Sequence, residues 1–283
     1  MKNKVSVVVC ARNEGHRLAQ ALEGIKLNDP DEIIVVDDDS TDNTVEIARR
    51  YTNKVILSKT GLTTNRQIGI DRARNELVAM IDADHILAAG DIDRLVNDLH
   101  HYKFDMVQGQ LISYANMSIW NFAEEDSWKL THNSVGPMPM IASAPVIYKK
   151  SIFEKVRFDG HITRNNDDAD FVYRLSQHKE FTFGVGSTKI RQLHFPELQT
   201  YLKKFMWYGY CDGEFLHKYP RRAYAHLFHL LVRYPILYSG RAIRYGKLRA
   251  IPFFVLQGAV RFVGLASYFV QLCFRARKLR EPA

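Results

Sequence analysis

The sequence predicts an α/β domain built on a mostly parallel sheet flanked by helices, followed by a helical region that is apolar and basic. In the first 105 residues, short runs of β-branched residues alternate with segments of helical spacing. This alternation implies right-handed crossovers and a parallel sheet. The chain has 283 residues, 46% of them hydrophobic, which is enough for one large core with an appendage.

Four predicted strands, each followed by a predicted helix, fill the first hundred residues. The strands are continuous and apolar, as in a sheet covered on both faces. The helices carry apolar residues on one face, and the second is expected to begin with Ser40 or Thr41 as its N-cap. The predicted strands are 5–10, 33–36, 55–57 and 77–81, and the predicted helices are 16–27, 40–51, 63–74 and 91–101.

After about residue 105 the alternation loosens. We expect a strand at 106–112, a helix at 116–132, a loop at 136–139, an apolar stretch at 141–148 and an amphipathic helix at 167–178. That last helix opens on Asp167, Asp168 and Asp170. Acids in a first turn stabilise a helix by about 0.3–1 kcal/mol, so a purely structural role is an alternative for this cluster.

The three cysteines, Cys10, Cys211 and Cys273, have no paired spacing. Neither a disulfide framework nor a thiolate zinc site is therefore indicated, which favours a reducing compartment. The apolar run at 5–10 is too short for the core of a signal peptide, so we expect a cytosolic protein.

The net charge of +8 is unevenly distributed along the chain. Residues 201–283 hold 15 Lys and Arg against three acids, and nine of the 14 tyrosines. Such a segment suits an anionic membrane surface, where aromatic rings lie among headgroups and cations meet lipid phosphates. Nucleic acid would attract the same charge, but it does not require a long apolar run, so we favour the membrane.

That apolar run is 251–274, 24 residues with one charge, Arg261. As a helix it would measure about 36 Å, enough to cross a hydrocarbon core of about 30 Å. A central Arg costs roughly 2.5–3.5 kcal/mol on insertion, and basic residues flank both ends. We therefore expect the helix to lie in the membrane interface, with Arg261 reaching the headgroups.

Asp82-Ala83-Asp84 follows the predicted strand 77–81 directly. Ligands of open α/β sheets bind beyond the carboxyl ends of the strands, and paired carboxylates there suit a hard divalent cation. Taken alone, an Asp-x-Asp at a strand end is more often a solvated turn. No Gly-x-Gly-x-x-Gly follows the first strand, which excludes the dinucleotide-binding fingerprint.

Five motifs taken together resemble the inverting glycosyltransferases of family 2, which have the GT-A fold. They are Ala11-Arg12-Asn13-Glu14, Val36-Asp37-Asp38-Asp39-Ser40-Thr41-Asp42, Asn65-Arg66, Ile81-Asp82-Ala83-Asp84 and Asp167-Asp168-Ala169-Asp170 with the helix that follows. The match covers residues 5 to about 200, in order and spacing. We therefore expect a GT-A domain over 1–200 and a membrane-associating helical region over 201–283.

The resemblance implies a role for each motif. Asn13 and Glu14 would lie near the nucleoside, Asp38 would accept from the N–H of the base, and Arg66 would help neutralise the diphosphate. Asp82 would face the ribose or the water shell of a Mn²⁺ or Mg²⁺ ion, and Asp84 would ligate that ion. His194 stands where related enzymes often carry a third metal ligand, with a structural histidine as the alternative. Asp168 matches the catalytic base, beside Asp167.

The expected activity is the metal-dependent transfer of a sugar from a nucleotide-sugar, with inversion at the anomeric carbon. The expected donor is a UDP-sugar, and the expected acceptor is lipid-linked or a growing glycan at the cytosolic membrane face. Polysaccharide biosynthesis is one such setting, and nucleic acid is not an expected partner. The alternatives are a nucleotidyltransferase, which usually shows a Gly-rich loop that is missing here, and a catalytically silent GT-A-like protein that binds membrane or nucleic acid. The oligomeric state is left open.

Overall fold

The chain forms two compact units, described here from a computed structural model over residues 4–114, 118–162, 166–193 and 197–278. The first unit comprises 1–115 and 132–194, and the second comprises 116–131 and 195–283. Helix α5 (Ile119–Thr131) falls inside the predicted first domain but groups with the second unit.

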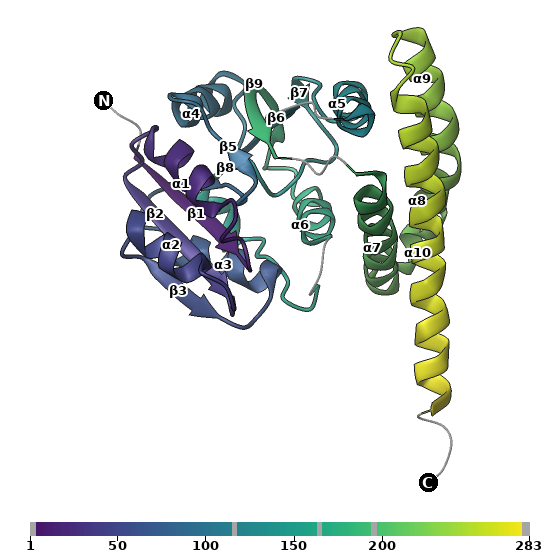
Figure 1. Cartoon of the computed structure of the whole chain (residues 1–283), viewed down its shortest axis with the longest axis horizontal. Helices are drawn as coiled ribbons and strands as arrows, with labels where there is room; N and C mark the ends of the chain where they lie inside the picture. Colours follow the sequence, from purple (N-terminus) through teal and green to yellow (C-terminus); the bar gives the residue numbers. More distant parts are fainter. Residues whose placement is uncertain (1–3, 115–117, 163–165, 194–196, 279–283) are drawn as a thin grey trace. The chain divides into compact units, whose positions relative to one another are not determined.

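The first unit opens with the predicted alternation of strands and helices (Figure 1). Its elements up to residue 101 are β1 (Val5–Ala11), α1 (Leu18–Lys26), β2 (Glu32–Asp38), α2 (Thr44–Tyr51), β3 (Val55–Ser58), α3 (Leu62–Arg72), β4 (Leu77–Met80), β5 (His85–Ile86) and α4 (Asp91–His101). The remaining elements are β6 (Met106–Ser113), β7 (Gly136–Pro137), β8 (Val146–Lys149), the 3₁₀ turn η1 (Lys150–Glu154), α6 (Asp167–Leu175) and β9 (Phe183–Gln192).

All described strands join one sheet in the order β3-β2-β1-β4-β8-β6-β9-β5, with β7 added on β9. The block β3-β2-β1-β4 is parallel, as the alternation predicts. Beyond it the sheet is mixed, because β8 runs antiparallel to both β4 and β6 while β6 and β9 are parallel. The carboxyl ends of β2, β1 and β4 consequently lie at one edge of the parallel block.

The sheet is covered on both faces, which explains why its central strands are uniformly apolar. Along β1, Val7 and Val9 join a core with α1, α2 and α4, whereas Val8 and Cys10 join a second core with α3 and α6. This is the two-residue alternation of a strand between two layers. The two cores hold the sheet rigid beneath the loops at its edge.

One predicted helix start is wrong. Helix α2 begins at Thr44, not at Ser40 or Thr41. The backbone N–H groups of Ser40 and Thr41 donate instead to the side chains of Asp37, at 3.0 Å, and Asn13, at 2.8 Å. These bonds hold the segment as a turn between the ends of β2 and β1. The predicted loop at 136–139 also contains the short strand β7.

The second unit is helical. It contains α5, α7 (Leu198–Lys218), the 3₁₀ turn η2 (Pro220–Arg222), α8 (Ala223–Phe228), the π-helical segment η3 (His229–Tyr238), α9 (Ser239–Arg244) and α10 (Ala250–Lys278). Helix α10 packs along α7 (Figure 1). Their backbones approach so closely that a Cβ at Gly209 would lie 1.9 Å from the carbonyl oxygen of Arg261. Glycine is therefore required at this crossing.

Residues 250–274 of α10 are long and apolar enough to cross a membrane, judged by length and composition alone. We expected Arg261 to reach lipid headgroups, but in the structure it is paired with a neighbouring helix. Its guanidinium donates to both carboxylate oxygens of Asp212 on α7, at 3.0 and 2.7 Å, and its side chain is 13% exposed. The rings of Tyr208 and Tyr234 lie 5.6 and 5.8 Å from the same group. The charge of Arg261 is thus compensated inside the helical unit.

Candidate active site

Asp82 and Asp84 lie just past the carboxyl end of β4, as predicted. Strand β4 continues as Ile81, whose N–H donates to the carbonyl oxygen of Val8 on β1 at 3.0 Å. The chain then leaves the sheet in a turn closed by a 3.0 Å hydrogen bond from the His85 N–H to the Asp82 carbonyl. The Asp82 and Asp84 side chains are 34% and 20% exposed, so both remain accessible to a ligand.

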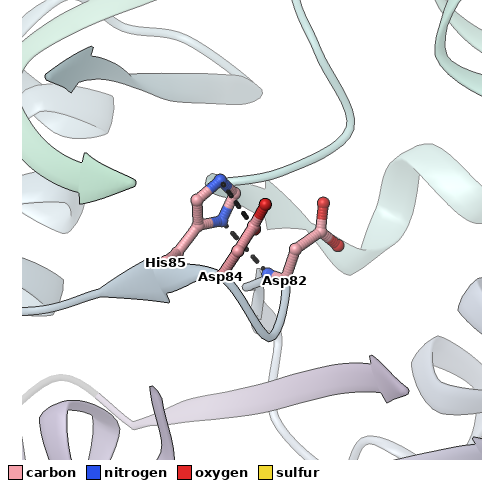
Figure 2. Close-up of side chains that lie close together, drawn as sticks. All are labelled: Asp82, Asp84 and His85. Atoms are coloured by element: carbon pink, nitrogen blue, oxygen red, sulfur yellow. Dashed lines mark hydrogen bonds and ion pairs between the residues drawn. The ribbon is translucent and has the colours of Figure 1, made fainter. Parts of the chain in front are cut away.

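His85 completes this cluster, and the sequence analysis missed it. Its side chain is 2% exposed, and its Nδ1 accepts a hydrogen bond from the Asp82 N–H at 3.1 Å. Its Nε2 lies 3.7 Å from Oδ1 of Asp84. Figure 2 shows the Asp84 carboxylate beside the ring and the Asp82 carboxylate turned away from it. The only signal in the sequence is a histidine directly after Asp-x-Asp.

The cluster fits a hard divalent cation. One ligand atom each from Asp82, Asp84 and His85 lie within 4.8 Å of one another. Carboxylate oxygens are the ligands that Mg²⁺ and Mn²⁺ prefer. His194, the predicted third ligand, is outside the described residues. The two aspartates are thus the described residues best suited to hold the ion.

Arg66 connects the end of β4 to the start of α6. Its side chain is 7% exposed, and it donates to Asp167 Oδ2 at 2.5 Å and to both Asp82 oxygens at 3.3 and 3.4 Å. Burial alone would lower the pKa of this guanidinium, but the Asp167 and Asp82 carboxylates raise it. Arg66 is therefore a fixed cation. Its buried Nε has no hydrogen-bond partner among the described residues.

The three acids of α6 lie in different environments. Asp167 is buried against Arg66, and burial raises the pKa of its carboxyl while the guanidinium opposes that rise. Asp170 is buried and accepts from two nitrogens of Arg174, at 2.9 and 2.6 Å. Asp168 is half-buried, and its carboxylate accepts the Ala169 N–H at 2.7 Å. Of the three, only Asp168 is accessible.

The predicted nucleoside contacts lie at the ends of β1 and β2. The Asn13 N–H donates to Ser40 Oγ at 2.9 Å, which joins the two loops. Asp38 Oδ1 accepts the Gly61 N–H at 3.0 Å, and its other oxygen lies 3.7 Å from Arg12. Asp37 beside it is 2% exposed, and its Oδ1 has no hydrogen-bond partner among the described residues. The loops are thus tied together by their own polar side chains.

Glu14 reaches the acidic cluster through Arg17, which the sequence analysis did not identify. The Arg17 guanidinium donates to Glu14 Oε1 at 2.7 Å and lies 3.9 Å from Asp84 Oδ2. The described site therefore contains two pairs of acids, each bridged by an arginine: Glu14 with Asp84 through Arg17, and Asp82 with Asp167 through Arg66. Asn13 and Asp38 lie at the same edge of the sheet without a direct contact to this network in the hydrogen bonds and ion pairs described.

The profile of glycosyl transferase family 2 matches residues 6–180 of this chain, which includes every described residue of the candidate site named above. A cholesterol galactosyltransferase from Borreliella burgdorferi is 32% identical over 121 residues, 40% of this chain and 34% of that protein. The matches to the first curated relatives cover 31% and 29% of the lengths of those proteins.

Solved structures share the fold at low sequence identity. The mannosyltransferase PcManGT from Pyrobaculum calidifontis, in complex with GDP-Man and Mn²⁺, is 16% identical, with a TM-score of 0.61 over 99% of this chain and 89% of that one. TarS residues 1–349 from Staphylococcus aureus, in complex with UDP-GlcNAc, is also 16% identical, with a TM-score of 0.53 over 94% of this chain and 89% of that one. These likenesses establish the GT-A fold.

Proposed function

The chain belongs to glycosyl transferase family 2, and on that premise we propose that it transfers a sugar from a nucleotide-sugar to a hydroxyl acceptor with inversion at the anomeric carbon. The proposed donor is a UDP-sugar, in line with the UDP-GlcNAc bound by TarS. The proposed acceptor is lipid-linked or a growing glycan, in line with the cholesterol galactosyltransferase relative.

The observation that carries this proposal is the position of Arg66 between Asp82 and Asp167. Asp82 belongs to the end of β4, where the donor would bind, and Asp167 stands next to Asp168 at the start of α6. One buried cation therefore fixes the donor-side carboxylate relative to the helix that carries the proposed base. Proton transfer and departure of the diphosphate need this fixed geometry.

At the donor side, Asp38 accepts from the base N–H, and Asn13 and Glu14 border the nucleoside. Asp82 and Asp84 hold Mn²⁺ or Mg²⁺, which when bound offsets the negative charge that develops on the leaving diphosphate. Arg66 supplies a second positive charge to the leaving diphosphate. His194 remains a proposed additional ligand.

At the acceptor side, Asp168 acts as the general base. The acceptor hydroxyl gives its proton to the Asp168 carboxylate as its oxygen attacks the anomeric carbon. The bond from that carbon to the diphosphate oxygen breaks, and the electron pair leaves with the nucleoside diphosphate. Because attack comes from the face opposite the leaving group, the anomeric configuration inverts. Asp167 keeps Arg66 in place during this step.

The second unit would bring the enzyme to an anionic bilayer at the cytosolic membrane face. Exposed apolar side chains alternate there with exposed arginines between residues 233 and 249, among them Ile243, Tyr245 and Leu248 beside Arg241 and Arg244. Apolar groups entering the interface and cations meeting lipid phosphates act together in peripheral binding. With Arg261 already paired to Asp212, this surface supplies the charge for docking.

A panel of nucleotide-sugars, screened for thermal stabilisation with and without Mn²⁺, tests the donor. A ligand that binds only the folded state must raise the apparent stability. We expect a UDP-sugar to raise the melting temperature when Mn²⁺ is present, and transfer to a lipid-linked acceptor to follow. A chain that responds to no nucleotide-sugar would support the catalytically silent alternative instead.

A further inference from the structure

His85 holds the turn that carries Asp82 and Asp84. It makes hydrogen bonds with both the N–H and the carbonyl of Asp82. The His85 N–H donates to the Asp82 carbonyl at 3.0 Å. In return, the Asp82 N–H donates to Nδ1 of the His85 ring at 3.1 Å (Figure 2). The ring is buried and His85 belongs to β5, which pairs with β9. The turn is therefore anchored to the sheet through one side chain.

This hydrogen bond fixes the tautomer of the ring. A backbone N–H can only donate, so Nδ1 must present its lone pair, and a neutral imidazole then carries its proton on Nε2. Nε2 lies 3.7 Å from Oδ1 of Asp84, so that proton faces the carboxylate. Ligation of a metal by Nε2 would require a ring that has lost both protons. Ligation by Nδ1 would break the bond to Asp82.

Asp84 is held by the last residue of β9, Gln192, and by Leu193, which follows it. Gln192 Nε2 donates to Asp84 Oδ2 at 3.0 Å, and the Leu193 N–H donates to the Asp84 carbonyl at 2.8 Å. Gln192 is also the residue that faces His85 in the β5–β9 pair. One strand pair thus supports both aspartates before any ligand binds.

We propose that His85 is a positioning residue for the Asp82–Asp84 pair and not a metal ligand, although one of its nitrogens lies within 4.8 Å of an oxygen of each carboxylate. This inference rests on the proposed metal-nucleotide site. The ring sets the backbone direction at Asp82 through Nδ1, and its Nε2 lies 3.7 Å from Asp84 Oδ1, beyond hydrogen-bond length. It thereby keeps the two carboxylates close enough to share one cation. Loss of such outer partners weakens metal affinity by about 10–100-fold.

Two substitutions in the full chain separate the two ring nitrogens. In His85→Asn the amide oxygen can take the place of Nδ1, and in His85→Gln the amide reaches the place of Nε2. We expect His85→Asn to retain most of the parent's Mn²⁺ affinity in the presence of UDP, and His85→Gln to lose about tenfold or more. The reverse order, or no loss in either variant, would overturn the role. Melting temperatures show whether each variant is folded.

The ring itself can be observed without metal. Nitrogen NMR of the full chain, with the His85 signal assigned from the His85→Asn variant, should show a neutral ring with its proton on Nε2. A proton on Nδ1 would contradict the proposal.

Electron-spin resonance with bound Mn²⁺ tests ligation directly. In a His194→Asn background, the spectrum should show no imidazole nitrogen coupled to the electron spin of Mn²⁺. A coupling that disappears with His85→Asn would make His85 a ligand. A parent that binds no Mn²⁺ would instead refute the proposed function.

Discussion

At the residue scale, Arg66 organises the candidate site because it is a buried cation that bridges Asp82 and Asp167, which lie 16 and 101 residues from it in the sequence. Its bonds to Asp82 and Asp167 leave Asp168 as the accessible acid of α6. Asp167 is 2% exposed and holds Arg66, so an acceptor hydroxyl cannot reach it without disrupting that pair. On this difference in exposure we propose Asp168, and not Asp167, as the base.

The base assignment predicts that Asp168→Asn lowers sugar transfer by about 10²–10⁴-fold with donor affinity unchanged. Asparagine keeps the size of the side chain but cannot take the acceptor's proton. Steady-state transfer and calorimetric donor binding, measured on the same preparation, check both parts. Near-parental transfer by Asp168→Asn would move the role to Asp167 or Asp170.

Sequence reasoning found the acids at the ends of β4 and β2 and at the start of α6, because a strand end or a helix start is visible in the pattern. It did not find His85, Arg17 or Gln192. These residues reach the site through contacts across β5–β9 and from the start of α1, and a single sequence carries no periodic signal for such contacts.

At the element scale, the second unit depends on a buried ion pair between α7 and α10. Burial alone would raise the pKa of Asp212, but the Arg261 guanidinium and His226 lower it to about 2. His226 Nε2 lies 3.3 Å from Asp212 Oδ2, so three elements converge on one carboxylate. Removing a single partner would leave a charge buried without compensation.

We therefore expect Asp212→Asn to destabilise the second unit by about 3–5 kcal/mol, whereas the double variant Asp212→Leu/Arg261→Leu should be close to neutral. Urea unfolding of both full-length variants, followed by tyrosine and tryptophan fluorescence, measures the difference. Equal destabilisation in the two variants would mean that packing, and not charge, holds α7 to α10.

The same pair predicts a pH dependence. Because the pKa of Asp212 is lower in the folded state than in the unfolded chain, its stabilisation is complete above about pH 4 and is lost as the pH falls towards 2. The stability difference between the parent and Asp212→Asn should therefore narrow over that range. A difference that stays constant from pH 5 to pH 2 would contradict the folded-state charge on Asp212.

Element boundaries were harder to predict than elements. The alternation of strands and helices up to α4 follows from apolar periodicity, yet the start of α2 was displaced by side chains that bond the backbone of the preceding turn. The grouping of α5 with the C-terminal helices depends on the packing of Ala123 against Tyr201, Phe205 and Phe253. Such packing between distant segments is not encoded in local pattern.

At the scale of the whole molecule, an acidic site in the first unit is combined with a basic, apolar surface in the second. If that surface docks on a bilayer as proposed, the bilayer would also deliver a lipid-linked acceptor. Ending the chain near residue 200 is an uncertain test of docking, because it would remove the helices that cover α5. Charge substitutions in the full chain avoid this problem.

Docking predicts that replacing Arg233, Arg241 and Arg244 by Gln weakens binding to phosphatidylglycerol vesicles by about a hundredfold at low salt, since each basic residue contributes about 1 kcal/mol. A matched control replaces three exposed arginines of the first unit, Arg49, Arg50 and Arg72, and should bind like the parent. Vesicle flotation at rising salt measures both. Equal loss of vesicle binding in the two triple variants would contradict a docking surface in the second unit. If the parent stays bound to vesicles at high salt, insertion of a helix into the bilayer would be favoured instead.

The central claim is that Asp82 and Asp84 hold the metal and the nucleotide of a sugar transferase, and calorimetry with UDP tests it most directly. The parent should bind UDP more tightly when Mn²⁺ is present, while Asp84→Asn should keep its melting temperature and lose the Mn²⁺-dependent part of that affinity. UDP binding that is the same with and without Mn²⁺ in the parent, or unchanged in Asp84→Asn, would contradict the claim.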